Sequence, residues 1–411
     1  MQTDIKSTIL NTRIGQEAND ILRSCVHCGF CTATCPTYQL LGDELDGPRG
    51  RIYLIKRVLE TDQVSENTQL HLDRCLSCGA CETTCPSGVK YRRLLDIGRE
   101  IVEHKVDRPS IDKIKRKTLS FILGNKELFS FLLSSARLFR PILPKQLQKS
   151  IPKKQKVISL TPSMPSMPSQ HKRKMILFRG CVHDAIAPEI NASAIRVLDK
   201  LGISVIEVDE LICCAAVSHH LLEKDKTEHT IKQNIDLLLA KLNPDVEAIF
   251  TTASACSLML KDYPKLMEDD AEYHPKASQL ASKFKDISEV ICNESVGSLT
   301  FEKSNKRIAF HSPCSMQHGL KVVNSIEHIL AQAGFNLVNV KDSHLCCGSA
   351  GTYSILQKDL SEQLLTNKVD NLTANQAEII ATANIGCLTH IQSGTETPVK
   401  HWVNLINQSL N

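Results

Sequence analysis

Two short cysteine motifs constrain this chain of 411 residues more than any other feature. CVHCGFCTATCP (25–36) and CLSCGACETTCP (75–86) both follow the pattern C-x2-C-x2-C-x3-C-P, and the second begins 50 residues after the first. Three thiolates at intervals of three residues can wrap one iron–sulfur cube, while the fourth, turned away at the proline, reaches a second cube. The spacing therefore predicts a mainly helical ferredoxin-type domain with two [4Fe–4S] clusters.

The ligands are expected to cross between the motifs. The first cluster is assigned to Cys25, Cys28, Cys31 and Cys85, and the second to Cys35, Cys75, Cys78 and Cys81. Gly29 and Gly79 leave room for backbone N–H groups to approach the cluster sulfides. Structural zinc is the alternative, but zinc ribbons use two separated C-x2-C pairs around one ion. Two groups of four cysteines, each followed by proline, fit that pattern poorly.

The segment between the motifs, residues 42–60, predicts a helix that packs against the cluster core. Apolar residues such as Ile52 and Ile55 recur in it at helical spacing. Arg49 and Arg51 in this segment lead to two hypotheses. They offset the negative charge of a thiolate-ligated cluster, or they belong to a solvated basic turn.

The second half of the chain is an internal repeat. The matching segments are 174–181 with 306–314, 197–214 with 329–347, and 247–256 with 378–387. Each copy predicts the order strand, helix, strand, helix, strand (βαβαβ), which implies parallel strands joined by crossover helices. Because each matching segment ends in cysteine just after a strand, the thiols of one repeat are expected to converge at the carboxyl ends of its strands.

The two repeats differ in what their thiols are expected to bind. In the second repeat, a third iron–sulfur cluster is expected on Cys314, Cys346, Cys347 and Cys387. In the first repeat the corresponding residues are Cys181, Cys213, Cys214 and Cys256. Ala215 stands where Gly348 stands, which leaves two readings of the first repeat open, a metal site and buried structural thiols. Cys292 fits neither repeat.

Three histidines, His311, His344 and His390, lie near the cysteines of the second repeat in the sequence. Imidazole is a common metal ligand, but hydrogen-bonded loop histidines are commoner than ligands. These histidines are therefore not included in the predicted ligand set.

Composition limits the functions that such a chain can have. Aromatic residues make up 4%, which argues against nucleic-acid binding by base stacking. The sequence contains no run of about 18 apolar residues, so no membrane-spanning helix is predicted, and the N-terminus lacks the apolar core of a secretory signal. The chain, with an odd number of cysteines, 17, is therefore expected in the reducing cytoplasm, not in disulfide-bonded form.

A basic stretch follows the first domain. The apolar pattern at 119–139 predicts a helix, and a Pro/Ser-rich segment (158–174) reads as a linker. Residues 128–183 contain eleven Lys or Arg and no acidic residue. Basic residues beside apolar ones predict a peripheral contact with the anionic cytoplasmic face of the inner membrane. An exposed linker beside a packed helix is the alternative.

These features predict an α+β chain in four parts. They are a bis-[4Fe–4S] ferredoxin-type domain (1–110), a helical connector with the basic linker (111–174), cysteine-rich repeat 1 (175–300) and cysteine-rich repeat 2 (301–411). Both repeats are expected to be α/β units.

The paired cluster motifs followed by two CCG-type repeats resemble the iron–sulfur subunits of flavin-dependent 2-hydroxyacid dehydrogenases, the glycolate oxidase (glycolate dehydrogenase) group among them. Residues 25–56, DSHLCCGSAGTY (342–353) and TANIGCLTH (382–390) carry the resemblance, which is weakest across 105–175. It implies partner subunits that contain FAD, and glycolate as the substrate, with D-lactate as a further candidate. More distantly, the second half is similar to the cysteine-rich subunit of heterodisulfide reductases, although each repeat lacks the terminal C-x2-C of that family.

The chain itself lacks the means to take a hydride from a substrate. No G-x-G-x-x-G follows a predicted strand and no P-loop is present, so no flavin is expected on this chain. Its expected role is electron transfer from FAD on a partner subunit, through the two ferredoxin-type clusters, to a respiratory acceptor such as a quinone. The alternatives are a heterodisulfide-reductase-like enzyme that works at Cys346 and Cys347, the iron–sulfur subunit of another 2-hydroxyacid or glycerol-3-phosphate dehydrogenase, and a zinc-stabilised scaffold.

Overall fold

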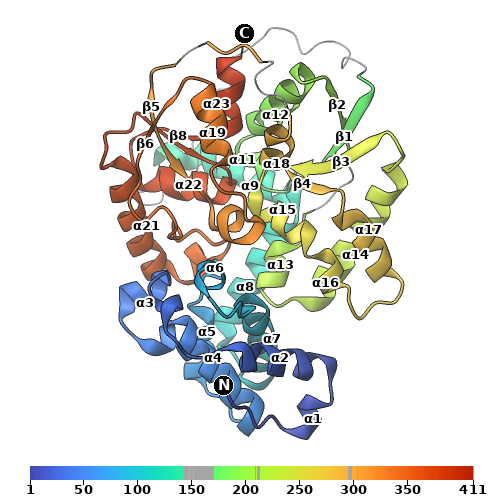
Figure 1. The fold of residues 1–411 in the computed structure, drawn as a ribbon, viewed down its shortest axis with the longest axis vertical. Coiled ribbons are helices and arrows are strands. Elements are labelled where there is room, and N and C mark those ends of the chain that lie inside the picture. The colour runs from blue at the N-terminus through green and yellow to red at the C-terminus, as the bar shows by residue number, and fades with distance from the viewer. Residues whose placement is uncertain are drawn as a thin grey trace.

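The computed structural model describes residues 1–142, 148, 151, 171–208, 210, 213–294, 299–302 and 304–410. The N-terminal helices form one end of the molecule, and two α/β units lie side by side at the other end (Figure 1). This is the α+β architecture that the sequence predicts, with helices first and two parallel sheets after them. Most of the predicted linker, residues 158–170, lies outside the described residues.

Short helices build the N-terminal region around the two cysteine motifs. They are α1 (Ser7–Leu10), α2 (Arg13–Ser24), α3 (Pro36–Leu41), α4 (Pro48–Thr61), α5 (Glu66–Asp73), α6 (Ala80–Thr84) and α7 (Tyr91–Lys105), with the 3-10 turns η1 (Phe30–Thr32) and η2 (Glu44–Asp46). Proline opens α3 and α4, because the first helical position needs no N–H donor. The predicted helix between the motifs is α4, and it buries Ile52 and Ile55 in the core of this region.

Two helices, not one, follow this region. The structure has α8 (Ser110–Gly124) and α9 (Lys126–Phe139), where the apolar pattern predicts a single helix. The Asn125 side chain accepts a hydrogen bond from the N–H of Leu128 at 2.9 Å, so it caps α9 and separates the two helices. A 3-10 turn, η3 (Arg140–Ile142), follows.

The two repeats have the same sheet topology. Repeat 1 contains β1 (Arg173–Leu177), β2 (Ile203–Glu207), β3 (Val246–Thr251) and β4 (Phe284–Asp286) in the order β2-β1-β3-β4, and repeat 2 contains β5 (Arg307–His311), β6 (Asn336–Val338), β7 (Ile379–Thr382) and β8 (Val399–His401) in the order β6-β5-β7-β8. Neighbouring strands are parallel throughout both sheets. Strand β7 is buried along its whole length, as expected where helices cover both faces of a sheet.

Helices connect these strands. In repeat 1 they are α11 (His183–Ile186), α12 (Glu189–Lys200), α13 (Ala216–His220), α14 (Lys224–Lys241), α15 (Ser254–Lys261), α16 (Tyr263–Leu266), α17 (Tyr273–Ala281) and α18 (Ile287–Cys292). In repeat 2 they are the π-helical turn η5 (Ser315–Leu320), α19 (Ser325–Gln332), α20 (Tyr353–Leu356), α21 (Lys358–Thr373), α22 (Ile385–Gly394) and α23 (Trp402–Ser409). The βαβαβ pattern is confirmed, and each repeat adds a fourth strand, β4 or β8. These strands are three residues long and each contains a charged residue, so neither gives the apolar run that predicts a strand.

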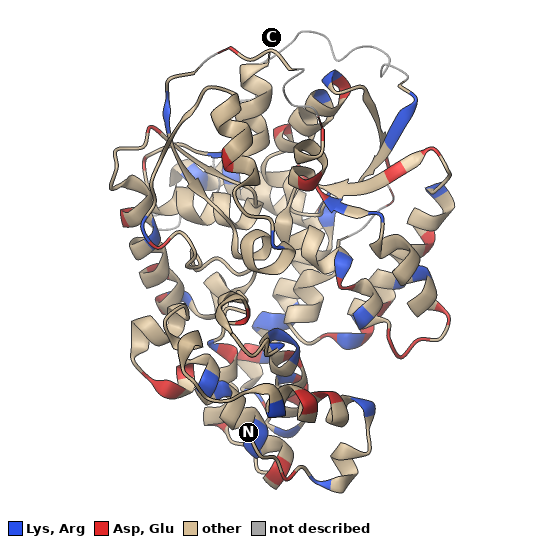
Figure 2. Ribbon diagram, viewed as in Figure 1, with Lys and Arg blue, Asp and Glu red and all other residues tan. Residues whose placement is uncertain are grey.

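Ion pairs join repeat 1 to the N-terminal helices. Arg13 contacts Glu268 at 2.6 Å and Asp269 at 2.8 Å. Lys265 contacts Glu17 at 2.9 Å. Residues of both charge signs are interleaved over the N-terminal helices (Figure 2). This junction is therefore largely electrostatic.

Neutral groups join repeat 2 to the same region. The Thr83 hydroxyl and the Nδ1 atom of His318 lie 2.9 Å apart, and the Tyr353 hydroxyl donates to the Arg74 carbonyl at 3.1 Å. Leu76, just after the first cysteine of the second motif, packs among apolar residues of repeat 2. Repeat 2 thus contacts the second cysteine motif directly.

Candidate metal centres

Thiols from both motifs line one small cavity. They belong to Cys25, Cys28, Cys31, Cys81 and Cys85. Burial, with a smaller contribution from the Cys25 thiol, raises the pKa of Cys31 to about 11. The four residues assigned to the first cluster are thus brought together, and their ligation of a cluster stays a prediction.

A second group consists of Cys35, Cys75, Cys78 and Cys81, of which Cys81 also lines the cavity. Burial raises the pKa of Cys81 well above its usual range, and the nearby thiols of Cys78, Cys75 and Cys35 add to this effect. Cys35 ends the first motif, yet it lies close enough to the second motif to influence its thiols. The structure therefore brings together the four residues assigned to the second cluster.

The backbone of both motifs suits an anionic iron–sulfur cluster. His27 and Gly29 have φ values of 55° and 86° in the first motif, and Ser77 and Gly79 have values of 52° and 75° in the second. Left-handed residues in a turn direct successive N–H groups to one side, and such concave arrays bind anions, including iron–sulfur clusters. Four soft thiols and a set of N–H donors are the groups that a [4Fe–4S] cluster requires.

Gly29 and Gly79 are suited to these turns mainly because they adopt a positive φ, since an added Cβ would meet only an arginine side chain. A Cβ on Gly29 would meet the Arg49 guanidinium at 3.5 Å, and one on Gly79 would meet the Arg92 side chain at 3.2 Å. Each motif therefore has an arginine beside its glycine. Arg49 is half-exposed and paired with Glu44 at 2.6 Å.

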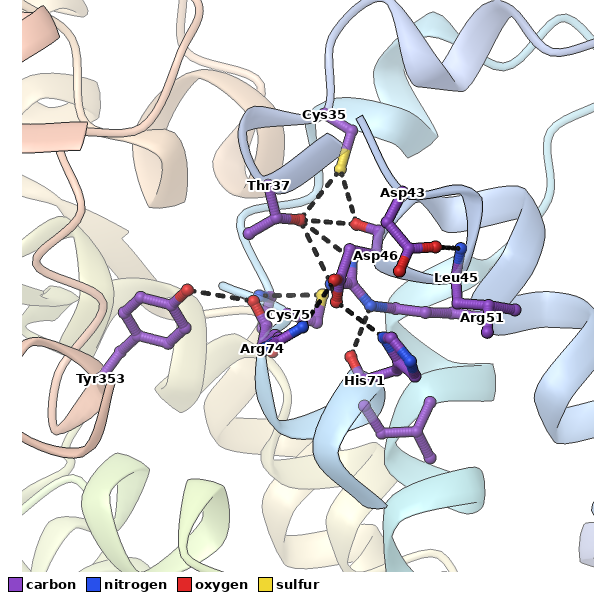
Figure 3. A network of polar contacts seen from close by, with 12 residues as sticks. Cys35, Thr37, Asp43, Leu45, Asp46, Arg51, His71, Arg74, Cys75 and Tyr353 are labelled. Atoms are coloured by element: carbon purple, nitrogen blue, oxygen red, sulfur yellow. Dashed lines mark hydrogen bonds and ion pairs between the residues drawn. The ribbon is translucent and has the colours of Figure 1, made fainter. Parts of the chain in front are cut away.

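A buried network ties the two motifs together (Figure 3). The Asp46 carboxylate accepts a hydrogen bond from Arg74 at 2.9 Å, contacts the Nδ1 atom of His71 at 3.0 Å and pairs with Arg51 at 3.4 Å. The backbone carbonyl of Asp46 accepts a hydrogen bond from Thr37 at 2.7 Å. Residues just after the first motif are thereby bound to residues just before the second, which fixes how the motifs face each other.

Arg51 brings a positive charge to the thiols of both motifs. Its side chain is buried, so the hypothesis of a solvated basic turn is wrong for this residue. Burial alone would lower the pKa of Arg51, but the thiols of Cys75 and Cys35 and the Asp46 carboxylate outweigh burial and raise it. A guanidinium in this position offsets the negative charge of thiolate ligands.

All four thiols of repeat 1 come together beyond strands β1, β2 and β3. The Sγ atoms of Cys181 and Cys213 lie 3.2 Å apart, and those of Cys214 and Cys256 lie 3.4 Å apart. Three of these cysteines are buried and Cys256 is half-buried. This proximity suits a metal site and also suits packed structural thiols, so both readings stay predictions.

The thiols of repeat 2 come together beyond strands β5, β6 and β7. The Sγ atoms of Cys314 and Cys346 lie 3.9 Å apart. Cys347, Cys387 and one ring nitrogen of His311 are buried and lie within 4.8 Å of one another. Cys346 and Cys347 influence each other's pKa, so the pair and the triad belong to one site.

Both repeats keep the turn that follows the Cys-Cys pair. Ala215 in repeat 1 has a φ of 69°, and Gly348 in repeat 2 has a φ of 90°. A Cβ on Gly348 would lie 2.7 Å from the carbonyl oxygen of Ser361 and 3.0 Å from the Cβ of Leu364, so only glycine fits there. In repeat 1 an alanine takes the left-handed conformation, which costs about 1–2 kcal/mol.

Sequence reasoning missed two charged residues of the candidate sites. Asp46 gave no signal, because its partners lie up to 28 residues away in the chain. Lys368 is 2% exposed, and its ammonium group donates to the Asp342 carbonyl at 2.7 Å. Here a signal was available, since KDLSEQLLTNK (358–368) matches KDKTEHTIKQN (224–234) and aligns Lys368 with a neutral residue, Asn234.

The second motif and repeat 2 share one buried apolar cluster. Cys346 and Tyr353 lie in it with Leu76, and the half-buried Cys78 and Cys314 pack against it. Burial, followed by the nearby Cys314 thiol, raises the pKa of Cys78 well above its usual range. The second group of thiols and the repeat 2 site are therefore neighbours.

A cleft of about 1,810 Å³ lies where the N-terminal region and both repeats meet. Its lining includes the thiols of Cys75, Cys78, Cys181, Cys213, Cys214, Cys256, Cys314 and Cys387. Cysteine residues of all three regions therefore border one cleft. Cys292 lies elsewhere, half-buried against the core that the repeats share.

Comparison with known proteins identifies both kinds of cysteine region. Residues 21–89 match the 4Fe-4S dicluster domain family, and residues 175–261 and 308–392 each match the cysteine-rich domain family. The chain is 46% identical over 410 residues to the glycolate oxidase iron-sulfur subunit of Escherichia coli (strain K12), covering 100% of this chain and 99% of that protein. It is 29% identical to the probable glycolate oxidase iron-sulfur subunit of Bacillus subtilis (strain 168), covering 91% and 89%.

More distant relatives cover less of the chain. Lactate utilization protein A of Exiguobacterium sp. (strain ATCC BAA-1283 / AT1b) is 26% identical over 57% of this chain and 97% of its own length. A crystal structure of a hypothetical protein from Helicobacter pylori shares the fold, with a TM-score of 0.54 and 11% identity over 97% of this chain and 72% of that one. Across the part of the chain that the structure describes, every helix is too short or too polar to cross a membrane.

Proposed function

The chain belongs to the family of glycolate oxidase iron–sulfur subunits, and on this premise we propose that it carries electrons from a FAD-containing partner subunit to a respiratory acceptor. When bound, iron–sulfur clusters supply sites that take up and release single electrons. The names of the relatives support glycolate as the substrate of the complex and lactate as the second candidate. Hydride removal is assigned to the flavin of the partner subunit.

The cysteines have separate tasks in this proposal. Cys25, Cys28, Cys31 and Cys85 hold the first [4Fe–4S] cluster, Cys35, Cys75, Cys78 and Cys81 hold the second, and Cys314, Cys346, Cys347 and Cys387 hold a third iron–sulfur centre. The turns at Gly29 and Gly79 direct N–H groups at the first two clusters. Arg51 offsets thiolate charge between them, and Cys78 packs against the apolar cluster that leads to repeat 2.

One observation carries the proposed route. Cys78 of the second motif and the Cys314–Cys346 pair of repeat 2 pack against the same apolar cluster, so three thiol groups follow one another through the molecule. The first motif lies at the outer end of this series. Cys28, Val26 and Phe30 are exposed there, with Val26 66% and Phe30 60% exposed. We assign this surface to contact with the flavin-containing subunit, because it adjoins the cavity lined by the thiols of the first motif.

Exchange of Cys35 for serine tests the ligand assignment. Cys35→Ser should alter the EPR signal of the reduced cluster assigned to Cys75, Cys78 and Cys81 and leave the other cluster intact. Cys292→Ser is the matched control, because Cys292 belongs to neither motif. If Cys35→Ser removed the cluster of Cys25, Cys28 and Cys31 instead, the crossed assignment would be wrong.

Activity of the separate subunit tests the electron-transfer role. The purified, cluster-loaded chain alone should not oxidise glycolate or D-lactate with an artificial acceptor, and addition of the flavin-containing subunit should restore oxidation. Phe30→Glu should weaken this restoration by raising the amount of partner needed. Turnover of glycolate by the chain alone would contradict the proposal.

Helices α8 and α9 support a second proposal, contact with an anionic membrane surface. Phe131 and Leu138 lie seven residues apart on one face of α9 and are 68% and 75% exposed. Phe121 on α8 is also exposed, and the basic stretch begins seven residues later, at Leu128. Large exposed apolar residues next to Lys and Arg suit an anionic lipid surface, at about 1 kcal/mol for each basic residue near it. Residues 152–170 of the basic stretch lie outside the described residues.

Vesicle co-sedimentation tests this second proposal. The full chain should bind vesicles that contain anionic lipid more strongly than neutral vesicles, and Phe131→Glu with Leu138→Glu should reduce the bound fraction severalfold. Ile355→Glu is the control, because Ile355 is also exposed, at 57%, but lies in repeat 2. Equal binding by the double variant and the wild type would remove α9 from the proposal.

A further inference from the structure

His311 is a buried histidine with unused polar atoms. It ends strand β5, three residues before Cys314, and its side chain is 2% exposed. Neither ring nitrogen has a hydrogen-bond partner among the residues that the structure describes. A buried polar group without a partner is destabilising by about 1–3 kcal/mol, so an unpaired imidazole in this position calls for a partner that the protein chain does not supply.

The neighbours of His311 are metal-ligating groups. One ring nitrogen lies within 4.8 Å of the thiols of Cys347 and Cys387, and all three residues are buried. Metal–sulfur and metal–nitrogen bonds are about 2.3 and 2.0–2.1 Å long for an ion such as zinc, so two ligands of one metal atom lie at most about 4.6 Å apart. Imidazole also replaces thiolate on iron in some iron–sulfur centres. The 4.8 Å bound on the triad is within about 0.2 Å of this limit, so small side-chain adjustments give it the spacing of a mixed Cys–His metal site, whose ligand chemistry it already has.

At two positions repeat 1 has a different residue from the one found beside the triad of repeat 2. The residue aligned with His311 is Phe178, which is fully buried and cannot bind a metal. The residue aligned with Lys368 is Asn234, whose amide donates to the Cys213 carbonyl at 2.9 Å. In repeat 2 the ammonium group of Lys368 is buried close to Cys346, Cys347 and Cys387. A buried cation needs a negative partner, and an anionic metal centre on these thiols provides one.

We propose that His311 is a nitrogen ligand, together with Cys347 and Cys387, of the iron–sulfur centre in repeat 2. The inference rests on the proposed function, which puts a third centre in this repeat. A neutral imidazole beside the four thiolates adds no negative charge to the centre, as a further thiolate would, and histidine ligation raises the reduction potential of iron–sulfur centres. The centre in repeat 2 therefore holds electrons more tightly than the two N-terminal clusters, which makes repeat 2 the acceptor end of the series.

Pulsed EPR with isotope labelling tests this ligation. The full-length chain is loaded anaerobically with iron and sulfide, once unlabelled and once with 15N-labelled histidine, and the hyperfine coupling of nitrogen to the reduced centre is recorded. A strong coupling that changes with the label is expected in the wild type. His311→Phe, which copies the residue of repeat 1, should lose this coupling and keep the signals of both N-terminal clusters. His344→Phe is the control and should keep the coupling.

A second variant guards against a folding defect. His311→Cys should restore a centre with the wild-type iron content, without nitrogen coupling and with a lower reduction potential. A third centre without a histidine nitrogen coupling in the wild type would overturn the role of His311 and leave the proposed function standing. Iron for only two clusters in the wild type and in Cys347→Ser alike would instead overturn the third centre itself. Zinc in place of iron on the intact triad would overturn the assignment to an iron–sulfur centre.

Discussion

Repeat 1 and repeat 2 share a topology, a cysteine spacing and a turn, but they surround their thiols differently. Phe178, Ala215 and Asn234 in repeat 1 stand where His311, Gly348 and Lys368 stand in repeat 2. At the aligned positions repeat 1 lacks the imidazole and the buried ammonium group of repeat 2, although another buried histidine, His183, lies near its thiols. Thiol proximity alone, which is closer in repeat 1, does not distinguish a metal site from a packed core.

Both repeats bring their thiols together in pairs, so pairing of thiols does not by itself identify a metal centre. Thiols that bind no metal are neutral and need no cation, whereas thiolates on iron leave negative charge that the protein has to balance. The charge balance around the thiols is therefore more informative than their number. By this criterion the metal centre is predicted in repeat 2.

The largest effect is expected from removal of one thiol in each repeat. Cys347→Ser should lower the iron content and reduce turnover of the reconstituted complex about tenfold or more, while both N-terminal clusters keep their EPR signals. Cys214→Ser, the matching change in repeat 1, should leave iron content unchanged. Iron analysis and steady-state rates measure both. Equal iron loss in the two variants would show that both repeats bind iron and would break the comparison.

The next effect concerns the turn after the Cys-Cys pair. Gly348→Ala should lower the free energy of unfolding by about 2–4 kcal/mol, because the new Cβ meets the Ser361 carbonyl and the turn requires a left-handed φ. Ala215→Gly should change it by less than about 1 kcal/mol, since relief of the left-handed alanine is offset by the extra freedom of glycine in the unfolded chain. Urea denaturation measures both values, and equal losses would contradict the difference between the turns.

A smaller effect with a change of sign is expected at Lys368. In the metal-free chain, Lys368→Met should raise the free energy of unfolding by about 1–2 kcal/mol, because a buried charge is removed. In the iron-loaded chain the same variant should be less stable than the wild type. Lys358→Met is the control, because Lys358 lies on the same helix and is exposed. The same sign in both forms would mean that Lys368 does not balance a metal centre.

The smallest effect compares the residues that cap the last helix of each repeat, Asp286 in repeat 1 and His401 in repeat 2. The Nε2 atom of His401 donates to the Thr252 carbonyl at 3.0 Å, and Nδ1 accepts from Val403 at 3.3 Å, so the ring is bonded in its neutral form. Burial, followed by the nearby His183 ring, lowers the pKa of His401 to about 3.

Since the pKa of His401 is lower in the folded chain than in the unfolded one, its contribution is fully present above about pH 6.5 and is lost as the pH falls toward 3. On going from pH 7.5 to 5.5, the free energy of unfolding should therefore fall by about 1.4 kcal/mol less in His401→Gln than in the wild type. Burial raises the pKa of Asp286, so at this residue acidification stabilises the folded state, the opposite of its effect at His401. Denaturation midpoints at the two pH values measure the effect, and Asp286→Asn should not reproduce it.

Local patterns in the sequence were sufficient for much of the fold. The 32-residue spacing between Cys181 and Cys213, repeated between Cys314 and Cys346, predicted the strand ends where the thiols meet. The fourth strands β4 and β8 could not be predicted, because three residues that include a charge carry no periodic signal. Asp46 was missed, and the burial of His311 was not foreseen, because burial and partners come from contacts between distant segments, which residue type alone does not report.

The Asp46 network has a consequence for the newly made chain, before any iron reaches it. Asp46 faces Arg51 and Arg74, so one carboxylate meets two guanidinium groups, and a bound cluster adds the thiolate charge that balances the second. Unbalanced positive charge in a buried site weakens the contact between the two motifs. We therefore expect the immature N-terminal region to open readily to proteases and to close when its clusters are inserted. On this expectation, cluster insertion protects the N-terminal region from proteolysis.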